Sequence, residues 1–192
     1  MDSRRTGIGF ACALLAVFCV CEVVDDSTDT SVDVESLRIL TTDITNWTDR
    51  ADGSFTGYEV FVGTDICNPP IDGACGPYNE QGVVKSIIQY MGRPTGTPDL
   101  LYNMDAFAMD FGTPAKAMAM FEAARPSSGT AMAGYATTVV VIDETTPNFG
   151  VTVFGHFDKF YIELKMDNYT VKEDAITDAK LFMDIYAAKI NG

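Results

Sequence analysis

Residues 157–166 read Phe157-Asp158-Lys159-Phe160-Tyr161-Ile162-Glu163-Leu164-Lys165-Met166. From Phe160 onward, apolar residues at the even positions alternate with Tyr161, Glu163 and Lys165, a pattern that gives a strand one buried face and one wet face. A helical pattern over residues 171–190 follows. Its apolar positions recur every three or four residues, at Ile176, Ala179, Phe182, Met183, Tyr186 and Ile190. We expect this stripe to lie on the buried face of the sheet.

Two further strand patterns, residues 135–143 and 149–155, come directly before this stretch. Short turns separate the three segments, which therefore predict an antiparallel meander. Farther upstream, residues 57–63 and 83–91 favour strands. Residues 100–111 are long and mostly apolar, as is typical of a central strand that is covered on both faces.

Helix signals flank these strands. Thr113 is a good N-cap residue and Pro114 suits a first helical position, so a helix is predicted over 114–125. Thr170-Val171-Lys172-Glu173 matches a capping box for the last helix. Residues 35–47 carry Leu37, Leu40, Ile44 and Trp47 at helical intervals and predict one more helix. The fold class is therefore α+β, a single domain over 35–192 with an antiparallel sheet packed by two amphipathic helices.

The N-terminal residues are typical of an export signal. Arg4 and Arg5 precede an apolar run over 8–24, which is shorter than the roughly 20 apolar residues that a membrane-spanning helix needs. Residues 25–34 are acidic and poor in apolar side chains, as expected of a linker. We therefore expect residues 1–24 to be a signal and the protein to be exported to the periplasm, the outer cell envelope or the extracellular space.

The end of this signal allows three outcomes. Cys19 or Cys21 could be lipidated, which would make the protein a lipoprotein, although bulky Phe18 and Val20 precede them. Alternatively, a signal peptidase cuts near residues 20–24 and releases a secreted protein, or the signal stays uncleaved as an anchor. Membrane contact is expected only through such an N-terminal anchor.

Cys67 and Cys75 enclose a segment with the turn signals Pro69-Pro70 and Asp72-Gly73. Two cysteines that flank a turn in an oxidising compartment predict a structural disulfide. A redox-active or metal-binding pair is the alternative. The spacing is not that of a C-x-x-C motif and no histidine is near, which favours the disulfide.

The chain has 13 basic and 27 acidic residues and a formal net charge of −14. Such a surface repels phosphate backbones and anionic lipid headgroups, which argues against a nucleic-acid or membrane-surface partner. One explanation of the acidic residues is that they keep the protein soluble, with adaptation to salty water as one cause. The other is that they bind a divalent cation or a cationic partner.

Few residues in the chain carry catalytic chemistry. His156 is the single histidine and falls at an expected hairpin turn. No cofactor motif is present, and a zinc site of histidine and cysteine is not expected. Asp105 and Asp110 share one strand but point to opposite faces, because five residues is an odd offset. Asp105 lies in an apolar stretch, so it must be paired, protonated or at the sheet edge.

Residues 104–117, with Phe121 and Arg125, resemble a pattern in a family of exported bacterial proteins of unknown function. That pattern is a strand ending in Asp-Met/Phe-Gly-x-Pro, followed by an alanine-rich helix that closes with arginine. Residues 71–74 with Tyr78, residues 155–162 and residues 171–190 are similar to its other motifs, and the cysteines interrupt the first of these. The resemblance implies an exported α+β domain and brings no catalytic residues.

These observations favour a non-catalytic binding or accessory module of the cell envelope. Its partner would be an envelope protein or a small ligand. Two alternatives are a secreted hydrolase with a carboxylate-based site near Asp105 or the Cys67–Cys75 loop, and a structural subunit of a surface complex.

Overall fold

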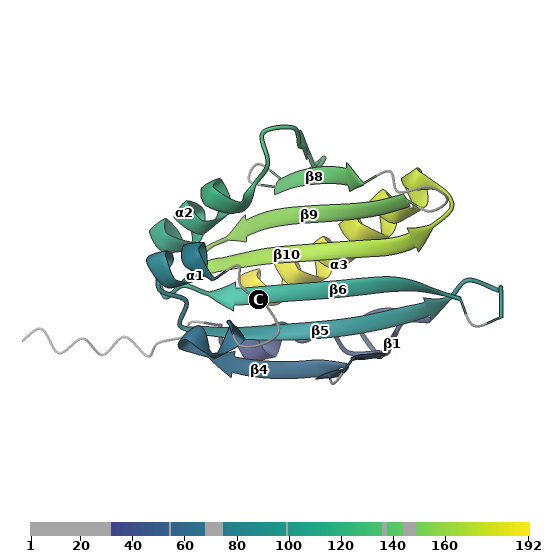
Figure 1. Cartoon of the computed structure of the whole chain (residues 1–192), viewed down its shortest axis with the longest axis horizontal. Coiled ribbons are helices and arrows are strands. Elements are labelled where there is room, and N and C mark those ends of the chain that lie inside the picture. The colour runs from purple at the N-terminus through teal and green to yellow at the C-terminus, as the bar shows by residue number, and fades with distance from the viewer. Residues whose placement is uncertain (1–31, 54, 68–74, 99, 136–137, 144–148) are drawn as a thin grey trace, which may run out of the picture. The chain divides into compact units, whose positions relative to one another are not determined.

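The computed structural model describes residues 32–192, apart from 54, 68–74, 99, 136–137 and 144–148. The described chain is an α+β domain built on an antiparallel sheet of eight strands, which confirms the predicted fold class. Helix α3 runs along one face of the sheet, and α1 and α2 lie at one end of the other face (Figure 1). Among the described residues, no helix is both long and apolar enough to cross a membrane.

The main sheet has the strand order β1-β5-β6-β10-β9-β8-β7, and β4 also pairs with β5. Its strands are β1 (Thr48–Asp49), β4 (Tyr58–Val62), β5 (Lys85–Pro94), β6 (Leu101–Asp110), β7 (Thr130–Ala131), β8 (Thr138–Asp143), β9 (Phe149–Phe157) and β10 (Phe160–Tyr169). A second, two-stranded sheet pairs β2 (Ala51–Asp52) with β3 (Phe55–Thr56). The helices are α1 (Gly76–Gln81), α2 (Pro114–Ala124) and α3 (Lys172–Asn191), and the 3-10 turns are η1 (Val34–Leu37) and η2 (Gly63–Ile66).

The predicted meander is confirmed, because β8, β9 and β10 are consecutive neighbours. Strand β10 then returns the chain to the middle of the sheet, where it pairs with β6. Strand β6 therefore lies between β5 and β10, as expected of a central strand. Strand β10 runs to Tyr169, beyond the predicted end at Met166, through an irregularity between these two residues.

The helix-side core lies between α3 and the sheet. It joins the even-numbered apolar residues of β6 and β10 to the stripe on α3: Met104, Ala106, Ala108, Phe160, Ile162, Leu164, Met166, Ala175, Ala179, Phe182, Met183 and Tyr186. The Trp47 and Phe182 rings pack edge to face, with 5.0 Å between ring centroids. The predicted role of the last helix is therefore confirmed.

The front core is a smaller cluster on the opposite face, under α1 and α2. Its members come from both helices and from the outward-facing residues of the central strands: Ile66, Tyr78, Val83, Ile88, Tyr90, Met109, Phe111, Ala117, Met120, Phe121 and Tyr161. It extends to Tyr90 in the middle of β5, and Phe55, Phe61, Phe107 and Phe154 pack against it. Charged side chains lie beside it on the same face, among them the pair of Arg50 and Asp105.

The helix predicted over 35–47 is wrong. Only η1 is helical there, and Leu40 is exposed although Leu37, Ile44 and Trp47 are buried. The cause is Gln89, a fully buried residue of β5 whose amide accepts from Ile39 N–H at 2.9 Å and donates to Ile39 C=O at 2.7 Å. These bonds fix Ile39 against β5 and pair the backbone groups that a helix would otherwise pair, and the chain then passes through turns over residues 41–46.

The two predicted helix starts differ in outcome. The Thr113 side chain accepts a hydrogen bond from Lys116 N–H and Pro114 opens α2, so this cap is confirmed. The capping box at Thr170 is wrong, because Val171 is the N-cap and makes no side-chain capping bond. Strand β10 continues to the buried residue Tyr169, which delays the helix until Lys172.

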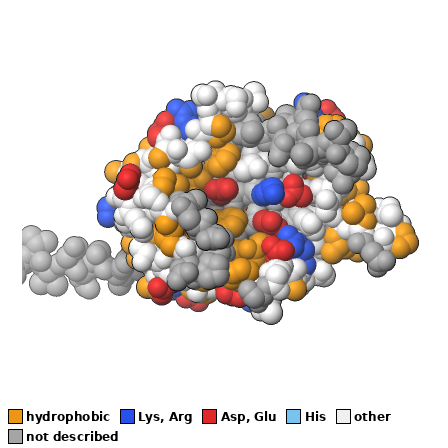
Figure 2. Space-filling view, viewed as in Figure 1, with side chains coloured by type: hydrophobic (Ala, Val, Ile, Leu, Met, Phe, Trp, Pro, Cys, Tyr) orange, Lys and Arg blue, Asp and Glu red, His pale blue; other side chains and the backbone are white. Residues whose placement is uncertain are grey.

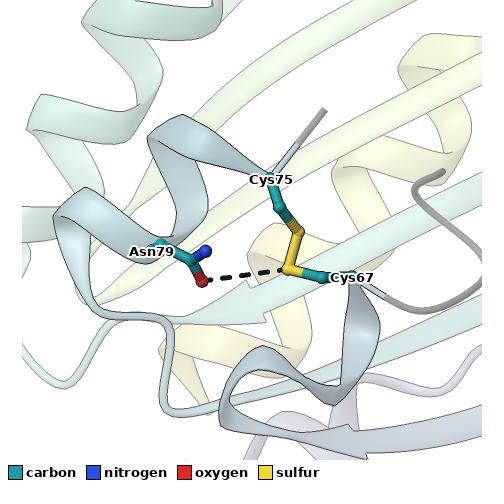
Figure 3. The surroundings of a disulfide bond; sticks show 3 residues. All are labelled: Cys67, Cys75 and Asn79. Carbon is teal, nitrogen blue, oxygen red and sulfur yellow. Dashed lines mark hydrogen bonds between the residues drawn. A yellow bond between two sulfur atoms is a disulfide. The ribbon is translucent and has the colours of Figure 1, made fainter. Parts of the chain in front are cut away.

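The predicted disulfide is present and joins Cys67 to Cys75, whose Cα atoms are 5.5 Å apart (Figure 3). Cys67 ends η2 and Cys75 precedes α1, so the bond ties this short helix to the chain that leaves β4. Both cysteines pack against the front core. The Asn79 side chain lies against the Cys67 sulfur at 3.8 Å.

Replacing Gln89 by leucine is expected to destabilise the domain by about 2–4 kcal/mol. The change leaves the Ile39 N–H and C=O without partners in a buried place, and each such group costs about 1–3 kcal/mol. Urea unfolding of the purified domain measures the difference. Gln81→Leu in α1 is the control and should change the midpoint little; equal midpoints for the two variants would contradict the assigned role of Gln89.

Removing the disulfide by the double change Cys67→Ser and Cys75→Ser is expected to lower the free energy of unfolding by roughly 2–3 kcal/mol. A reductant should destabilise the wild-type domain by a similar amount and leave the double variant unaffected. Thermal unfolding with and without reductant measures both effects. A wild-type domain that is indifferent to reductant would contradict the prediction.

Candidate ligand-binding site

A pocket of about 670 Å³ opens near the end of β5. Its lining residues come from three neighbouring segments: Asn46, Thr48, Arg93, Pro94 and Tyr102. We call this site the Arg93 pocket. Thr48 in β1 pairs with Gly92, and Arg93 itself pairs with Tyr102 of β6, so the strand ladder sets the spacing of the walls. Asn46 has a left-handed backbone with φ of 67°, which a short polar side chain tolerates.

The Arg93 guanidinium is held by stacking and by charge. It lies 5.2 Å from the Trp47 ring centroid and 4.9 Å from that of Tyr102. Its Nη2 donates to Asp178 Oδ2 of α3. Each cation–π contact contributes about 0.5–2 kcal/mol. The ion pair with Asp178 joins β5 to α3. Arg93 is therefore fixed in position before any ligand arrives.

A second layer of contacts supports this arrangement. The Tyr169 hydroxyl donates to Asp178 Oδ2 at 2.7 Å, and the Tyr169 ring stacks on Tyr102 with 4.5 Å between centroids. Burial, and then the hydrogen bond to Asp178, raise the pKa of Tyr169 well above its usual value. Tyr169 thus remains a hydrogen-bond donor to Asp178 at any physiological pH.

The chemistry of the Arg93 pocket is that of recognition. A guanidinium, an amide and a hydroxyl can all donate hydrogen bonds, and Pro94 and Tyr102 add apolar surface. Three of the five lining residues are polar and two are apolar, so the pocket offers both hydrogen-bond donors and apolar contact surface to a ligand. No carboxylate or histidine is among the five lining residues, so they offer no general base to a bound ligand.

Asp105, the carboxylate singled out by sequence, lies on the face opposite α3. It is paired with Arg50 Nη2, which confirms one of the three states expected for it. Burial raises the pKa of Asp105 and Arg50 opposes that shift. Charged side chains gather in the middle of this face (Figure 2). Asp105 therefore belongs to an array of ion pairs and lies outside the lining of the Arg93 pocket.

Asp110 and His156 also lie outside that pocket. Asp110 ends β6, accepts from Gly112 N–H at 2.6 Å and pairs with Lys159 at 2.7 Å. It therefore closes the strand before α2. The expectation that His156 sits at a turn is wrong, because β9 continues through it to Phe157 and the turn falls at residues 158–159. The His156 ring contacts the Pro114 carbonyl oxygen at the start of α2, at 3.2 Å.

Glu163 is a half-buried carboxylate with a raised pKa, whereas the sequence pattern predicted only that it lies on the solvent-facing side of its strand. It lies on the front face of β10, where Tyr161 OH donates to its Oε2 at 3.0 Å. Burial raises the pKa of Glu163, while the Tyr161 bond and Lys165 lower it. The alternating sequence of β10 predicts which face Glu163 lies on. It does not predict that the front core extends to Tyr161, beside Glu163 on that face.

The structure describes two of the four cysteines singled out by the sequence. Cys67 and Cys75 form the disulfide described above, and Cys19 and Cys21 lie outside the described residues. Within the described ranges, no three histidine, cysteine, aspartate or glutamate side chains gather as metal ligands would.

Comparison with known proteins identifies no family. No protein-family model matches the chain, and neither does any curated protein. Among solved structures, the chain is similar to the extracellular domain of PknH from Mycobacterium tuberculosis, with 12% sequence identity and a TM-score of 0.48. The likeness covers 82% of this chain and 94% of that one. At this level it assigns neither a family nor an activity.

Glu163→Gln is expected to stabilise the domain at neutral pH and to have less effect in acid. A carboxyl whose pKa is raised on folding favours the folded state below its unfolded pKa, and this contribution is lost as pH rises through the folded pKa. Glutamine keeps an acceptor for Tyr161 but carries no charge. Unfolding midpoints from about pH 4 to pH 8 measure the effect, with exposed Glu80→Gln as control. A gain that shrinks as pH rises would refute it.

Proposed function

We propose that this chain is an exported, non-catalytic binding domain of the cell envelope that takes a small polar ligand in the Arg93 pocket. The observation that carries the proposal is the guanidinium fixed between Trp47 and Tyr102 at the wall of a pocket. A rigid donor on paired strands binds a ligand with little loss of side-chain entropy. A ligand rich in oxygen acceptors suits the donors around it.

Charge favours an uncharged ligand. Asp178 already neutralises Arg93, and the chain as a whole carries a net charge of −14. An anion would meet a repulsive surface and a guanidinium that is already paired. Sugars and other neutral compounds with hydroxyl or carbonyl oxygens avoid both costs, and their apolar surfaces can contact Pro94 and Tyr102.

Export is supported by the N-terminal signal pattern and by the disulfide between Cys67 and Cys75. Structural disulfides persist in oxidising compartments such as the periplasm or the extracellular space. We keep a lipoprotein anchor at Cys19 or Cys21, a freely secreted form and an uncleaved signal anchor as three forms of this proposal.

The carboxylate-based hydrolase receives less support. Asp105 is paired with Arg50, and Asp110 is paired with Lys159 on the opposite face. The two carboxylates therefore do not converge on one bond, as a glycosidase pair must.

Ligand binding can be followed through Trp47, the single tryptophan of the chain, which adjoins Arg93. Fluorescence titration with a panel of neutral monosaccharides and zwitterionic amino acids is expected to give a saturable change for at least one compound. Acetate and inorganic phosphate serve as anionic comparisons and should bind more weakly. A panel without any saturable response would count against the proposal.

Arg93→Lys is expected to weaken that binding roughly tenfold or more, because lysine keeps the charge but loses the planar fork and the stacking. Arg125→Lys is the matched control, since Arg125 is an exposed residue beyond α2 that pairs with Glu122. Equal affinities for Arg93→Lys and wild type would remove the pocket from the proposal.

The form of the exported protein can be read from its mature N-terminus. Mass spectrometry of the protein recovered from its native cell separates the three forms. A diacylglycerol adduct on Cys19 or Cys21 identifies the lipoprotein, and an unmodified terminus near residues 20–25 identifies the secreted form. An intact signal on membrane-bound protein identifies the uncleaved anchor, whereas an intact signal on cytosolic protein contradicts export.

A further inference from the structure

In the described part of the chain, strand β4 forms one edge of the main sheet. It pairs with β5 on one side, and no described strand pairs with its other side. Its sequence, Tyr58-Glu59-Val60-Phe61-Val62, contains no proline or lysine, and its register to β5 is continuous. Natural edge strands usually carry such residues or a bulge, which blocks pairing with another chain. The opposite edge differs, since β7 covers part of β8.

The backbone hydrogen bonds show which residues of β4 face outward. Tyr90 N–H donates to Gly57 C=O at 2.7 Å, and Gly63 N–H donates to Val84 C=O at 2.8 Å. In an antiparallel ladder every second residue bonds the same neighbour. The odd-numbered residues of β4 therefore bond β5, and the backbone groups of Tyr58, Val60 and Val62 point away from the sheet.

The exposed side chains belong to the same residues. Val60 is 37% exposed and Val62 is 64% exposed, although both are large and apolar. Positive φ angles at Gly57 and Gly63 end the strand on either side. The free edge is therefore a five-residue segment with outward backbone donors and acceptors and exposed valines.

We propose that β4 is a self-pairing edge, through which a second copy of this chain adds its own β4 in antiparallel orientation. The register centred on Val60 places Val60 opposite its copy and Val62 opposite Tyr58. All three residues with outward backbone groups then bond one another. Glu59 lies opposite Phe61, so no like charges meet. The alternative register centred on Glu59 would place two carboxylates directly opposite each other, which is unfavourable.

The net charge of −14 on each copy opposes association. Pairing is therefore expected to be weak at low ionic strength and tighter when salt screens the repulsion. This surface is separate from the Arg93 pocket, and its test is independent of ligand binding.

Sedimentation of the domain, residues 32–192, tests the proposal over micromolar to millimolar concentration. All residues of both cores lie within this segment, which therefore forms a unit of its own. We expect a monomer–dimer equilibrium that Val60→Pro weakens roughly tenfold or more, because the change removes an outward N–H that the monomer does not use. Val60→Thr is the matched control and should still dimerise.

Cysteine cross-linking tests the register and does not depend on how well the proline variant folds. Val60→Cys faces its own copy across the twofold axis, whereas Val62→Cys faces Tyr58. Under mild oxidation, Val60→Cys should form dimers faster, although Val62 is the more exposed residue. A monomer at every concentration, a dimer that survives Val60→Pro, or faster cross-linking of Val62→Cys would overturn the proposal.

Discussion

The fold is governed by a shortage of helix relative to sheet. An eight-stranded sheet has two faces to cover, and α3, with 20 residues, covers one of them. Helices α1 and α2 have only 6 and 11 residues and cover one end of the other face. The ion pair between Arg50 and Asp105 lies on the rest of that face, and both side chains are largely buried there. This face thus combines an apolar core with charged side chains in its middle (Figure 2).

Polar contacts then replace helix packing in fastening the N-terminal part of the domain. Gln89 holds Ile39 by two hydrogen bonds across the sheet. Three arginines repeat one arrangement, in which a guanidinium stacks on a tyrosine and pairs with an aspartate: Arg38 with Tyr58 and Asp49, Arg50 with Tyr90 and Asp105, and Arg93 with Tyr102 and Asp178. The planar guanidinium of arginine stays charged while it stacks on an aromatic ring, so each arginine combines a stacking contact with a directional ion pair. Of these three guanidinium groups, that of Arg93 lines the pocket of about 670 Å³.

The sequence predicted the elements whose signals are local. The alternation in β10, the Thr113–Pro114 start of α2 and the stripe on α3 each depend on neighbours within a few residues. It failed for residues 35–47, because Gln89, 50 positions from Ile39, decides their path. It also missed the pocket, because Arg93 and Asp178 are 85 positions apart and meet only after α3 packs on the sheet. The strand predicted over 83–91 stops short of Arg93, whereas β5 continues through it to Pro94.

The disulfide belongs to the same argument about coverage. A helix as short as α1 is unstable by itself. The entropy lost in forming its first turn is greater than the free energy gained from its few hydrogen bonds. Its contribution to the front core is Tyr78, which is 9% exposed, and one buried ring is a weak attachment. The disulfide between Cys75 and Cys67 supplies a further constraint, because it reduces the conformational freedom of the unfolded chain around α1. The oxidation state of two sulfur atoms therefore determines how well one end of the front face stays covered.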